Sequence, residues 1–212
     1  MDRTDRVDPF AVTSLEDLRE IYAPPRATAI DKETDHVTDP GRAFIAASPF
    51  LILATASETG VDCSPKGDAP GFVQLLDDHT ILIPDRPGNN RIDGMKNIID
   101  NPNVGIIFMV PGSNWTYRVN GAARISTDPE LLGRFEVRGK LPRAVIIVSV
   151  EQAFSHCPKA FVRAKLWDAD TKNLPDSVPN QGDFAADRDG GDKAYAEKYY
   201  EEYLERMKSG LY

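Results

Sequence analysis

Short apolar runs rich in β-branched and aromatic residues alternate with polar turns through the middle of the chain, which predicts a β-sheet. Six strands are predicted, over residues 49–57, 61–76, 80–84, 104–110, 116–125 and 144–150. The second begins as VDCSPKG and resumes at GFVQLL, and turns at 58–60 and 77–78 join the first three into a meander. Short connections favour antiparallel pairing, and a sheet of this length is expected to close so that its edges are hidden.

Helical periodicity and capping residues predict short helices around these strands. The predicted helices span residues 13–22, 40–47, 92–100, 128–138 and 193–208. Thr13 or Ser14 can cap the first helix, and Asp128 can cap the fourth. Residues 168–192 are polar with little periodicity, so we expect a surface excursion or a partly disordered arm there.

The charge of the chain limits its partners. The 212 residues carry a formal net charge of −8, and an acidic surface repels nucleic acids and anionic membranes at long range. The chain has no run of about twenty apolar residues, and its first ten residues lack the apolar segment of a signal peptide. We therefore expect a cytoplasmic protein that binds neither nucleic acid nor membrane.

The cysteines and histidines do not form a metal-binding pattern. Cys63 and Cys157 are far apart, and two free thiols are expected rather than a disulfide. His36, His79 and His156 also stand apart, so no metal site is expected. Cys157 lies beside His156, but no orienting acid is identifiable, so no catalytic residue is assigned.

The loop after the third strand gathers cations and small hydrogen-bonding residues. It reads DRPGNNRIDGMK, and its glycines and asparagines allow tight backbone conformations that bring amide groups close to an anion. Arg91 would offer a bidentate fork to a phosphate group, and Lys96 a point charge. The alternative is a solvated loop whose cations pair with Asp85 and Asp93.

The sequence Ser64-Pro65-Lys66-Gly67 interrupts the apolar pattern of the second strand. The Ser64 hydroxyl and the Lys66 ammonium could bind the same anion, which makes a flavin phosphate site the first hypothesis. The alternative is an edge bulge, because proline and glycine both disfavour regular pairing.

Two later segments also carry candidate residues. Alternation along TYRVNGAARI places Arg118 on the face opposite Tyr117 and Val119, so it points outward or into an interface. Farther along the chain, Arg163 and Trp167 could cover a planar ring by packing or by a cation–π contact.

Together these motifs resemble the pyridoxamine 5′-phosphate oxidase-like FMN-binding proteins, most of all a bacterial branch of that superfamily. The resemblance covers roughly residues 42–168, in the ordered segments PFLILATAS, CSPKGDAPGFVQLLDD, TILIPDRPGNNRIDGMKNIIDNPNVGIIFMVPG, YRVNGAARI and HCPKAFVRAKLW. It implies a mainly β (α+β) fold, a six-stranded antiparallel split β-barrel with flanking short helices and a C-terminal helix. It also implies a homodimer with an FMN in each of two clefts at the subunit interface.

The resemblance divides the chain into three parts. Residues 1–40 would form an N-terminal helix and connector that pack on the barrel. Residues 41–167 would form the FMN-binding split β-barrel domain, and residues 168–212 a C-terminal arm and helix.

The resemblance also implies which residues contact the cofactor. They lie on the second strand and on the loop after the third: Ser64, Lys66, Gly67, Pro84, Asp85, Asn90 and Arg91, with Lys96 just beyond. The partner subunit would approach the ring near Arg118 and near the segment that holds Arg163 and Trp167. Two departures argue against oxidation of pyridoxamine 5′-phosphate itself. Asn90-Arg91-Ile92 stands where the authentic oxidases carry Ser-Arg-Lys, and HCPKAFVRAKLW lacks their arginine- and histidine-rich substrate motif.

The function implied is that of an FMN-dependent oxidoreductase, which moves hydride or electrons between a reduced nicotinamide or small organic substrate and an acceptor. One alternative is a flavin-binding carrier or sensor without turnover. Another is a split barrel that uses the deazaflavin F420 or, with less support, haem, since His156 is the only histidine near a plausible cleft.

Overall fold

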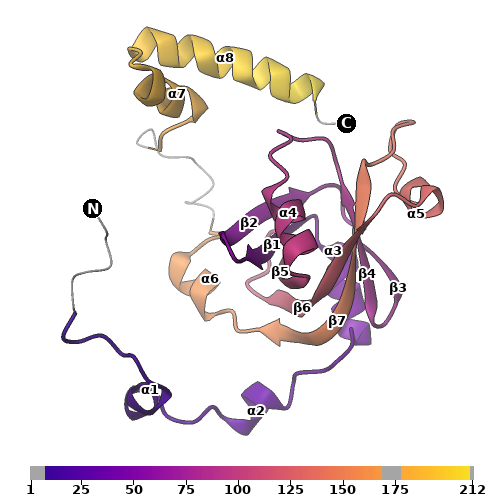
Figure 1. Cartoon of the computed structure of the whole chain (residues 1–212), viewed down its shortest axis with the longest axis vertical. Helices are drawn as coiled ribbons and strands as arrows, with labels where there is room; N and C mark the ends of the chain where they lie inside the picture. Colours follow the sequence, from indigo (N-terminus) through magenta and orange to yellow (C-terminus); the bar gives the residue numbers. More distant parts are fainter. Residues whose placement is uncertain (1–7, 169–177, 211–212) are drawn as a thin grey trace. The chain divides into compact units, whose positions relative to one another are not determined.

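The sheet has seven strands in the order β2-β1-β5-β6-β7-β4-β3, and all neighbours are antiparallel (Figure 1). The computed structural model describes residues 8–168 and 178–210. The strands are β1 (Phe50–Ser57), β2 (Gly60–Gly67), β3 (Gln74–Asp77), β4 (Thr80–Asp85), β5 (Asn103–Met109), β6 (Thr116–Ser126) and β7 (Ala144–His156). The predicted class, a mainly β fold of the split-barrel type with short flanking helices, is confirmed.

The stretch predicted as a single second strand forms two strands, β2 and β3, at opposite ends of the strand order. β2 pairs with β1 without a register shift, so that Leu51 lies opposite Lys66 and Ile52 lies opposite Pro65. Pro65 has no N–H group to donate, and an edge strand tolerates proline because one of its sides has no partner strand. The bulge considered for this sequence is therefore not formed.

The predicted closure of the sheet is wrong, because β2 and β3 do not pair with each other in the described residues. The chain turns away after β2: the Asp68 N–H donates to the Pro49 carbonyl at 3.1 Å, and the Phe72 N–H donates to the Ala69 carbonyl at 3.1 Å. Helix α4 (Asp93–Asp100) packs on β1 and β2 instead. A helix can protect the edge region of a sheet as a further strand would.

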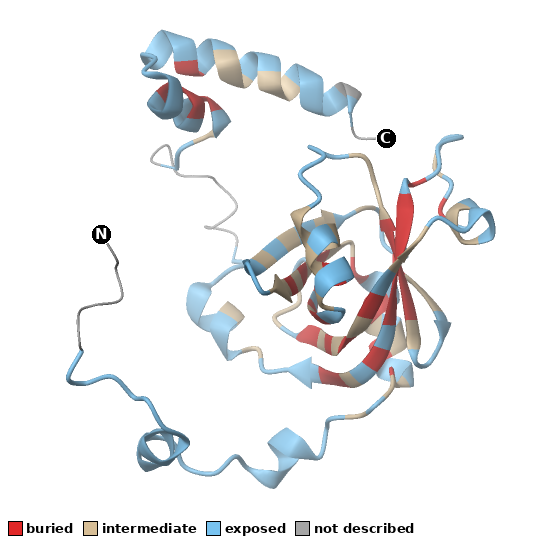
Figure 2. Cartoon of the chain, in the orientation of Figure 1, coloured by how far each residue is buried: buried red, intermediate tan, exposed pale blue. Residues whose placement is uncertain are grey.

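Alternating side chains build the main core on one face of β1, β5 and β6. Leu51 and Leu53 of β1, Ile106 and Phe108 of β5, and Val119 of β6 are all nearly inaccessible to solvent. Figure 2 shows this burial concentrated along the strands of the sheet.

Strands β4 and β7 are buried on both faces. Leu82, Val145 and Ile147 form a second apolar cluster with Phe135, which follows α5 (Pro129–Gly133). A strand covered on both faces needs no polar alternation, which explains the continuous apolar runs TILIP and AVIIV.

The predicted helices form with small shifts at their ends. They are α1 (Leu15–Ile21), α3 (Asp39–Ala47), α4, α5 and α8 (Lys193–Ser209). The Ser14 side chain caps α1, and Asp128 caps α5 as predicted. The fourth predicted helix is shorter than expected and ends at Gly133.

Three further helices form where none was predicted: α2 (Ala27–Ile30), α6 (Lys159–Ala164) and α7 (Gln181–Asp189). Helix α7 lies in the stretch expected to have little periodicity. Asn180 and Asp183 form a capping box there, which satisfies backbone N–H groups at its first turn. Residues 169–177 of the same stretch lie outside the described residues.

The chain divides into two compact units. The first, Met1–Glu33, contains α1 and α2, and each of its described residues is exposed. The second, Thr34–Tyr212, contains the sheet and begins where Thr34 exchanges backbone hydrogen bonds of 3.1 and 2.7 Å with Ala153 of β7. The packing of residues 1–40 on the barrel and the division into three parts stay predictions. In the described part of the chain, no helix is both long and apolar enough to cross a membrane.

Candidate cofactor-binding site

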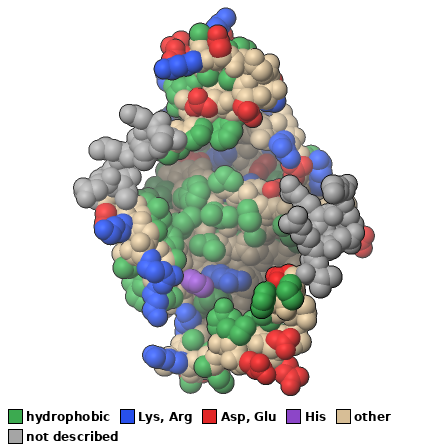
Figure 3. All heavy atoms as spheres, turned by 90° about the vertical axis from the view of Figure 1, so that its left-hand side faces the viewer, with side chains coloured by type: hydrophobic (Ala, Val, Ile, Leu, Met, Phe, Trp, Pro, Cys, Tyr) green, Lys and Arg blue, Asp and Glu red, His purple; other side chains and the backbone are tan. Residues whose placement is uncertain are grey.

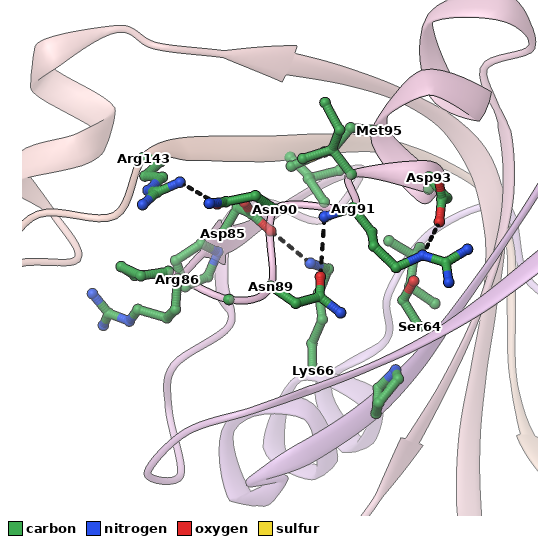
Figure 4. Close-up of a pocket in the computed structure, with 18 of the residues that line it drawn as sticks. Ser64, Lys66, Asp85, Arg86, Asn89, Asn90, Arg91, Asp93, Met95 and Arg143 are labelled. Carbon is green, nitrogen blue, oxygen red and sulfur yellow. Dashed lines mark hydrogen bonds and ion pairs between the residues drawn. The ribbon is translucent and has the colours of Figure 1, made fainter. Parts of the chain in front are cut away.

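A cavity of about 570 Å³ opens between β2, the loop after β4, the start of α4 and the start of β7 (Figure 4). Leu53, Phe72, Met95 and Ile146 form its apolar part. Most of the other lining residues come from β2 and from residues 84–94, and they include polar and charged side chains as well as prolines and glycines. A lining that combines apolar side chains with cations suits a planar ring that carries an anionic group.

Strand β2 forms one wall of the cavity. Ser64 and Lys66 are partly buried, whereas Cys63 and Pro65 are exposed, as the alternation of a strand requires. Lys66 Nζ lies 2.8 Å from Asp85 Oδ1, and the two side chains are only 18% and 23% exposed. The last residue of β4 therefore holds the Lys66 ammonium at the cavity wall.

The loop after β4 is held at its first residue. Arg86 Nε lies 3.0 Å from Asp68 Oδ2, and Arg86 also donates to the Phe135 carbonyl at 2.8 Å. Farther on, Asn90 and Ile92 have positive φ angles of 61° and 52°. Asparagine tolerates this conformation, but a β-branched residue such as Ile92 is strained in it, and such strain often marks a functional loop.

The exposed cations of this loop pair with a neighbouring carboxylate. Arg91 Nε lies 2.7 Å from Asp93 Oδ2, and Lys96 Nζ lies 3.3 Å from Asp93 Oδ1. The Arg91 hydrogen bond holds the pKa of Asp93 below its ordinary value. The alternative considered from the sequence, in which the cations pair with Asp85 and Asp93, thus describes the ion pairs of this loop. It does not remove the phosphate hypothesis, because the Arg91 side chain is 77% exposed and lines the cavity.

The first turn of α4 has no side-chain cap. The residue before the helix is Ile92, whose apolar side chain has no acceptor atom, so in the described part of the chain the first N–H groups lack the usual side-chain cap. A Cβ added to Gly94 would lie 3.5 Å from both Ser64 Oγ and Thr55 Oγ1, which shows how closely the helix start approaches β2. Free N–H groups and a hydroxyl beside them fit an anion such as phosphate.

Seven of the residues predicted to contact the cofactor line this cavity: Ser64, Lys66, Gly67, Pro84, Asp85, Asn90 and Arg91. The other four do not line it. Lys96 pairs with Asp93 on α4, and Arg163 is exposed on α6. Arg118 lies on the outer face of β6, 5.7 Å from the centre of the Phe154 ring, and Trp167 Nε1 donates to the Ser113 carbonyl at 2.7 Å. The interface roles of Arg118, Arg163 and Trp167 and the phosphate contact of Lys96 stay predictions.

Sequence reasoning missed Arg143, which also lines the cavity. It immediately precedes β7, and the first pair of the β4–β7 ladder is Asp85 with Ala144. Only that register brings Arg143 beside the loop after β4. The sequence signal was a cation at the start of an apolar strand, which by itself names no partner.

Comparison with solved structures gives distant similarities. HupZ of Group A Streptococcus is 27% identical, with a TM-score of 0.46 over 56% of this chain and 93% of that chain. An FMN-binding protein from Syntrophomonas wolfei is 12% identical, with a TM-score of 0.43 over 55% and 83% of the two chains. The FAD-binding protein from Mycobacterium smegmatis is 16% identical, with a TM-score of 0.39 over 58% and 97%. No curated protein is significantly similar in sequence.

A family model gives the assignment. The model described as pyridoxamine 5′-phosphate oxidase matches residues 37–157, more than half of the chain, and this range contains every strand and the whole cavity lining. The chain therefore belongs to the pyridoxamine 5′-phosphate oxidase family.

Proposed function

We propose that the cavity binds a flavin nucleotide, FMN, and that the protein is an FMN-dependent oxidoreductase. The observation that carries the proposal is the cavity itself. In a member of this family, the cavity lining combines apolar side chains with an uncapped helix start, a serine hydroxyl and several cations.

The lining residues fit the phosphate end of such a cofactor. Ser64 Oγ and the free N–H groups at the start of α4 would donate to the phosphate oxygens. Arg91 would turn from Asp93 to the phosphate and form a charge-assisted pair. The isoalloxazine ring would lie against the apolar part of the lining, which excludes water from one of its faces.

Lys66 is the candidate residue for setting the reduction potential of the flavin ring. Its ammonium is fixed by Asp85 at the cavity wall, and a cation beside the N1–C2 edge favours the anionic reduced flavin. When bound, FMN supplies the hydride and electron chemistry. The contribution of this chain is then to position the cofactor and to set the charge around it.

Two alternatives need the same phosphate contacts from Ser64, Arg91 and the start of α4, which we call the phosphate clamp. A flavin carrier or sensor needs the clamp but no turnover, and steady-state oxidation of NADH or NADPH by the purified holoprotein separates it from an enzyme. A deazaflavin user needs similar phosphate contacts, and its absorption spectrum separates it from an FMN protein.

The proposal includes a homodimer with the cofactor at the subunit interface. Ile107 and Arg118 are paired neighbours on the outward face of β5 and β6, and Ile107 is 39% exposed. Figure 3 shows apolar side chains gathered in the middle of one face, with Lys or Arg and His side chains among them. A second copy on such a face would bury apolar area and could bring Arg163 and Trp167 to the ring. Sedimentation tests this: a monomer at micromolar concentration that still holds FMN contradicts the interface site.

The test of the cofactor is the visible spectrum of the purified protein, with the mass of any molecule that heat releases. Flavin bands and the mass of FMN support the proposal and lead to the nicotinamide assay. A colourless protein that takes up no added FMN refutes it.

A further inference from the structure

Among the cations of the cavity, Arg143 forms no ion pair with a carboxylate of the described residues. Four cations line the cavity: Lys66, Arg86, Arg91 and Arg143. The first three form ion pairs with Asp85, Asp68 and Asp93 at 2.8, 3.0 and 2.7 Å. Among the described residues, no carboxylate forms an ion pair with Arg143, whose side-chain hydrogen bond goes to the neutral amide of Asn90.

Arg143 is nevertheless held in place. Its backbone N–H donates to the Asp85 carbonyl at 3.0 Å, directly before the first pair of the β4–β7 ladder. Its Nη1 donates to Asn90 Oδ1 at 2.5 Å, and Asn90 has a left-handed backbone with φ 61°. A positioned guanidinium with unused N–H groups matches the two oxygens of a carboxylate or phosphate group.

The side chains of Arg143 and Arg91 lie on different sides of the loop after β4. Figure 4 shows Arg143 directed toward Asn90 on one side, while Arg91 extends toward Asp93 on the other. A phosphate group held by Arg91 and the start of α4 therefore leaves Arg143 available for another anion. A free positive charge in a cavity attracts an anionic ligand group more strongly than a paired one does.

We propose that Arg143, together with the Asn90 amide, forms a second oxyanion subsite in this cavity. It rests on the proposed flavin function and names the substrate chemistry of that site: a ligand with a carboxylate or phosphate group besides the phosphate at Arg91. That oxyanion has two possible sources, a second phosphoryl group on the cofactor, as in FAD, or the anionic group of a second substrate.

The experiment uses the full chain loaded with FMN and titrates inorganic phosphate by calorimetry. The variants are Arg143→Gln and, as a matched control, Arg124→Gln, an exposed arginine of β6 outside the cavity lining. We expect Arg143→Gln to weaken phosphate binding about tenfold, the effect typical of one lost charge-assisted contact, and Arg124→Gln to leave it unchanged. FMN affinity should be the same in all three proteins.

A second arm identifies the source of the oxyanion. If Arg143 serves a second phosphoryl group of the cofactor, Arg143→Gln weakens FAD binding about tenfold and leaves FMN binding unchanged. If it serves a substrate, only phosphate binding by the FMN-loaded protein is weakened. The subsite is overturned if Arg143→Gln changes neither, or if it weakens FMN and FAD equally, since Arg143 would then serve the single phosphate.

The two proposals can fail separately. A wild-type protein that takes up neither flavin refutes the proposed function, and the same phosphate titration is then run on the flavin-free protein. Loss of a phosphate site in Arg143→Gln but not in Arg91→Gln would still support the subsite, and no effect of Arg143→Gln would overturn it. Thermal unfolding of each variant separates loss of binding from loss of fold, and Arg143→Lys should restore part of the phosphate affinity.

Discussion

Replacing Arg91 by alanine tests the phosphate clamp most directly. The Arg91 side chain is 77% exposed and pairs with Asp93 at 2.7 Å, so little packing is lost in the variant. Removal of a charge-assisted contact to a phosphate group typically weakens binding about ten- to a hundredfold. Phosphate binding must displace the Asp93 partner, which places the expected loss near the lower end, about tenfold.

The ion pairs of Asp93 also provide control variants for Arg91→Ala. Lys96 also pairs with Asp93, at 3.3 Å, but does not line the cavity, so Lys96→Ala should weaken FMN binding less than Arg91→Ala does. Asp93→Asn removes the competing carboxylate and should raise FMN affinity a few-fold, because Arg91 is then released. Riboflavin, which has no phosphate group, should bind equally to the wild type and to Arg91→Ala.

The assay is a fluorescence titration of flavin-free protein with FMN and with riboflavin, after circular dichroism has shown that each variant is folded. An Arg91→Ala protein with wild-type FMN affinity refutes the clamp. An equal loss for riboflavin also refutes it, since the effect would then not pass through the phosphate group.

Three further predictions concern other parts of the molecule. Lys66→Ala should weaken flavin binding or lower the flavin reduction potential, because it removes the cation at the cavity wall; unchanged values for both would remove Lys66 from the site. Gly121→Ala should lower the free energy of unfolding in urea by about 1–3 kcal/mol or more, because the new Cβ would lie 2.0 Å from the Ser149 carbonyl oxygen. The carboxyl of Asp189 should titrate near a pKa of about 2 by NMR, because Arg188 hydrogen-bonds to it, and Arg188→Gln should return that pKa toward 3.8.

The controls for these predictions follow from the same contacts. A Cβ at Gly105 would meet Asn120 Oδ1 at 3.4 Å, so Gly105→Ala should destabilise the sheet less than Gly121→Ala. An equal loss in the two variants would refute the steric argument. The lowered Asp189 pKa means that its ion pair contributes to stability above the unfolded value of 3.8 and that this contribution is lost as pH falls through about 2. An Asp189 carboxyl that titrates near 4 would contradict the pair.

Local features of this protein could be read from the sequence because the interactions that create them span few residues. The cap of α5 at Asp128 and the alternation that buries Tyr117 and Val119 while leaving Arg118 outward both follow from neighbouring side chains. The phosphate-binding candidates on β2 and on the loop after β4 were also visible, since serine, lysine and asparagine interrupt apolar runs there. The resemblance of these ordered motifs to a known family then indicated the fold.

Only the tertiary structure determines which strands pair and which side chains come together at the cavity. The separation of β2 from β3 to opposite edges depends on pairing with β1 and β4, and nothing in the run from Val61 to Leu76 specifies it. Arg143 reaches the cavity only through the register of Ala144 with Asp85, a pairing between residues far apart in the chain. Likewise, Lys66 forms its ion pair with Asp85 and Arg91 forms its ion pair with Asp93 because these side chains lie close together in the folded chain. Composition and periodicity act within a few residues, whereas pairing and charge partners depend on how distant segments pack against one another.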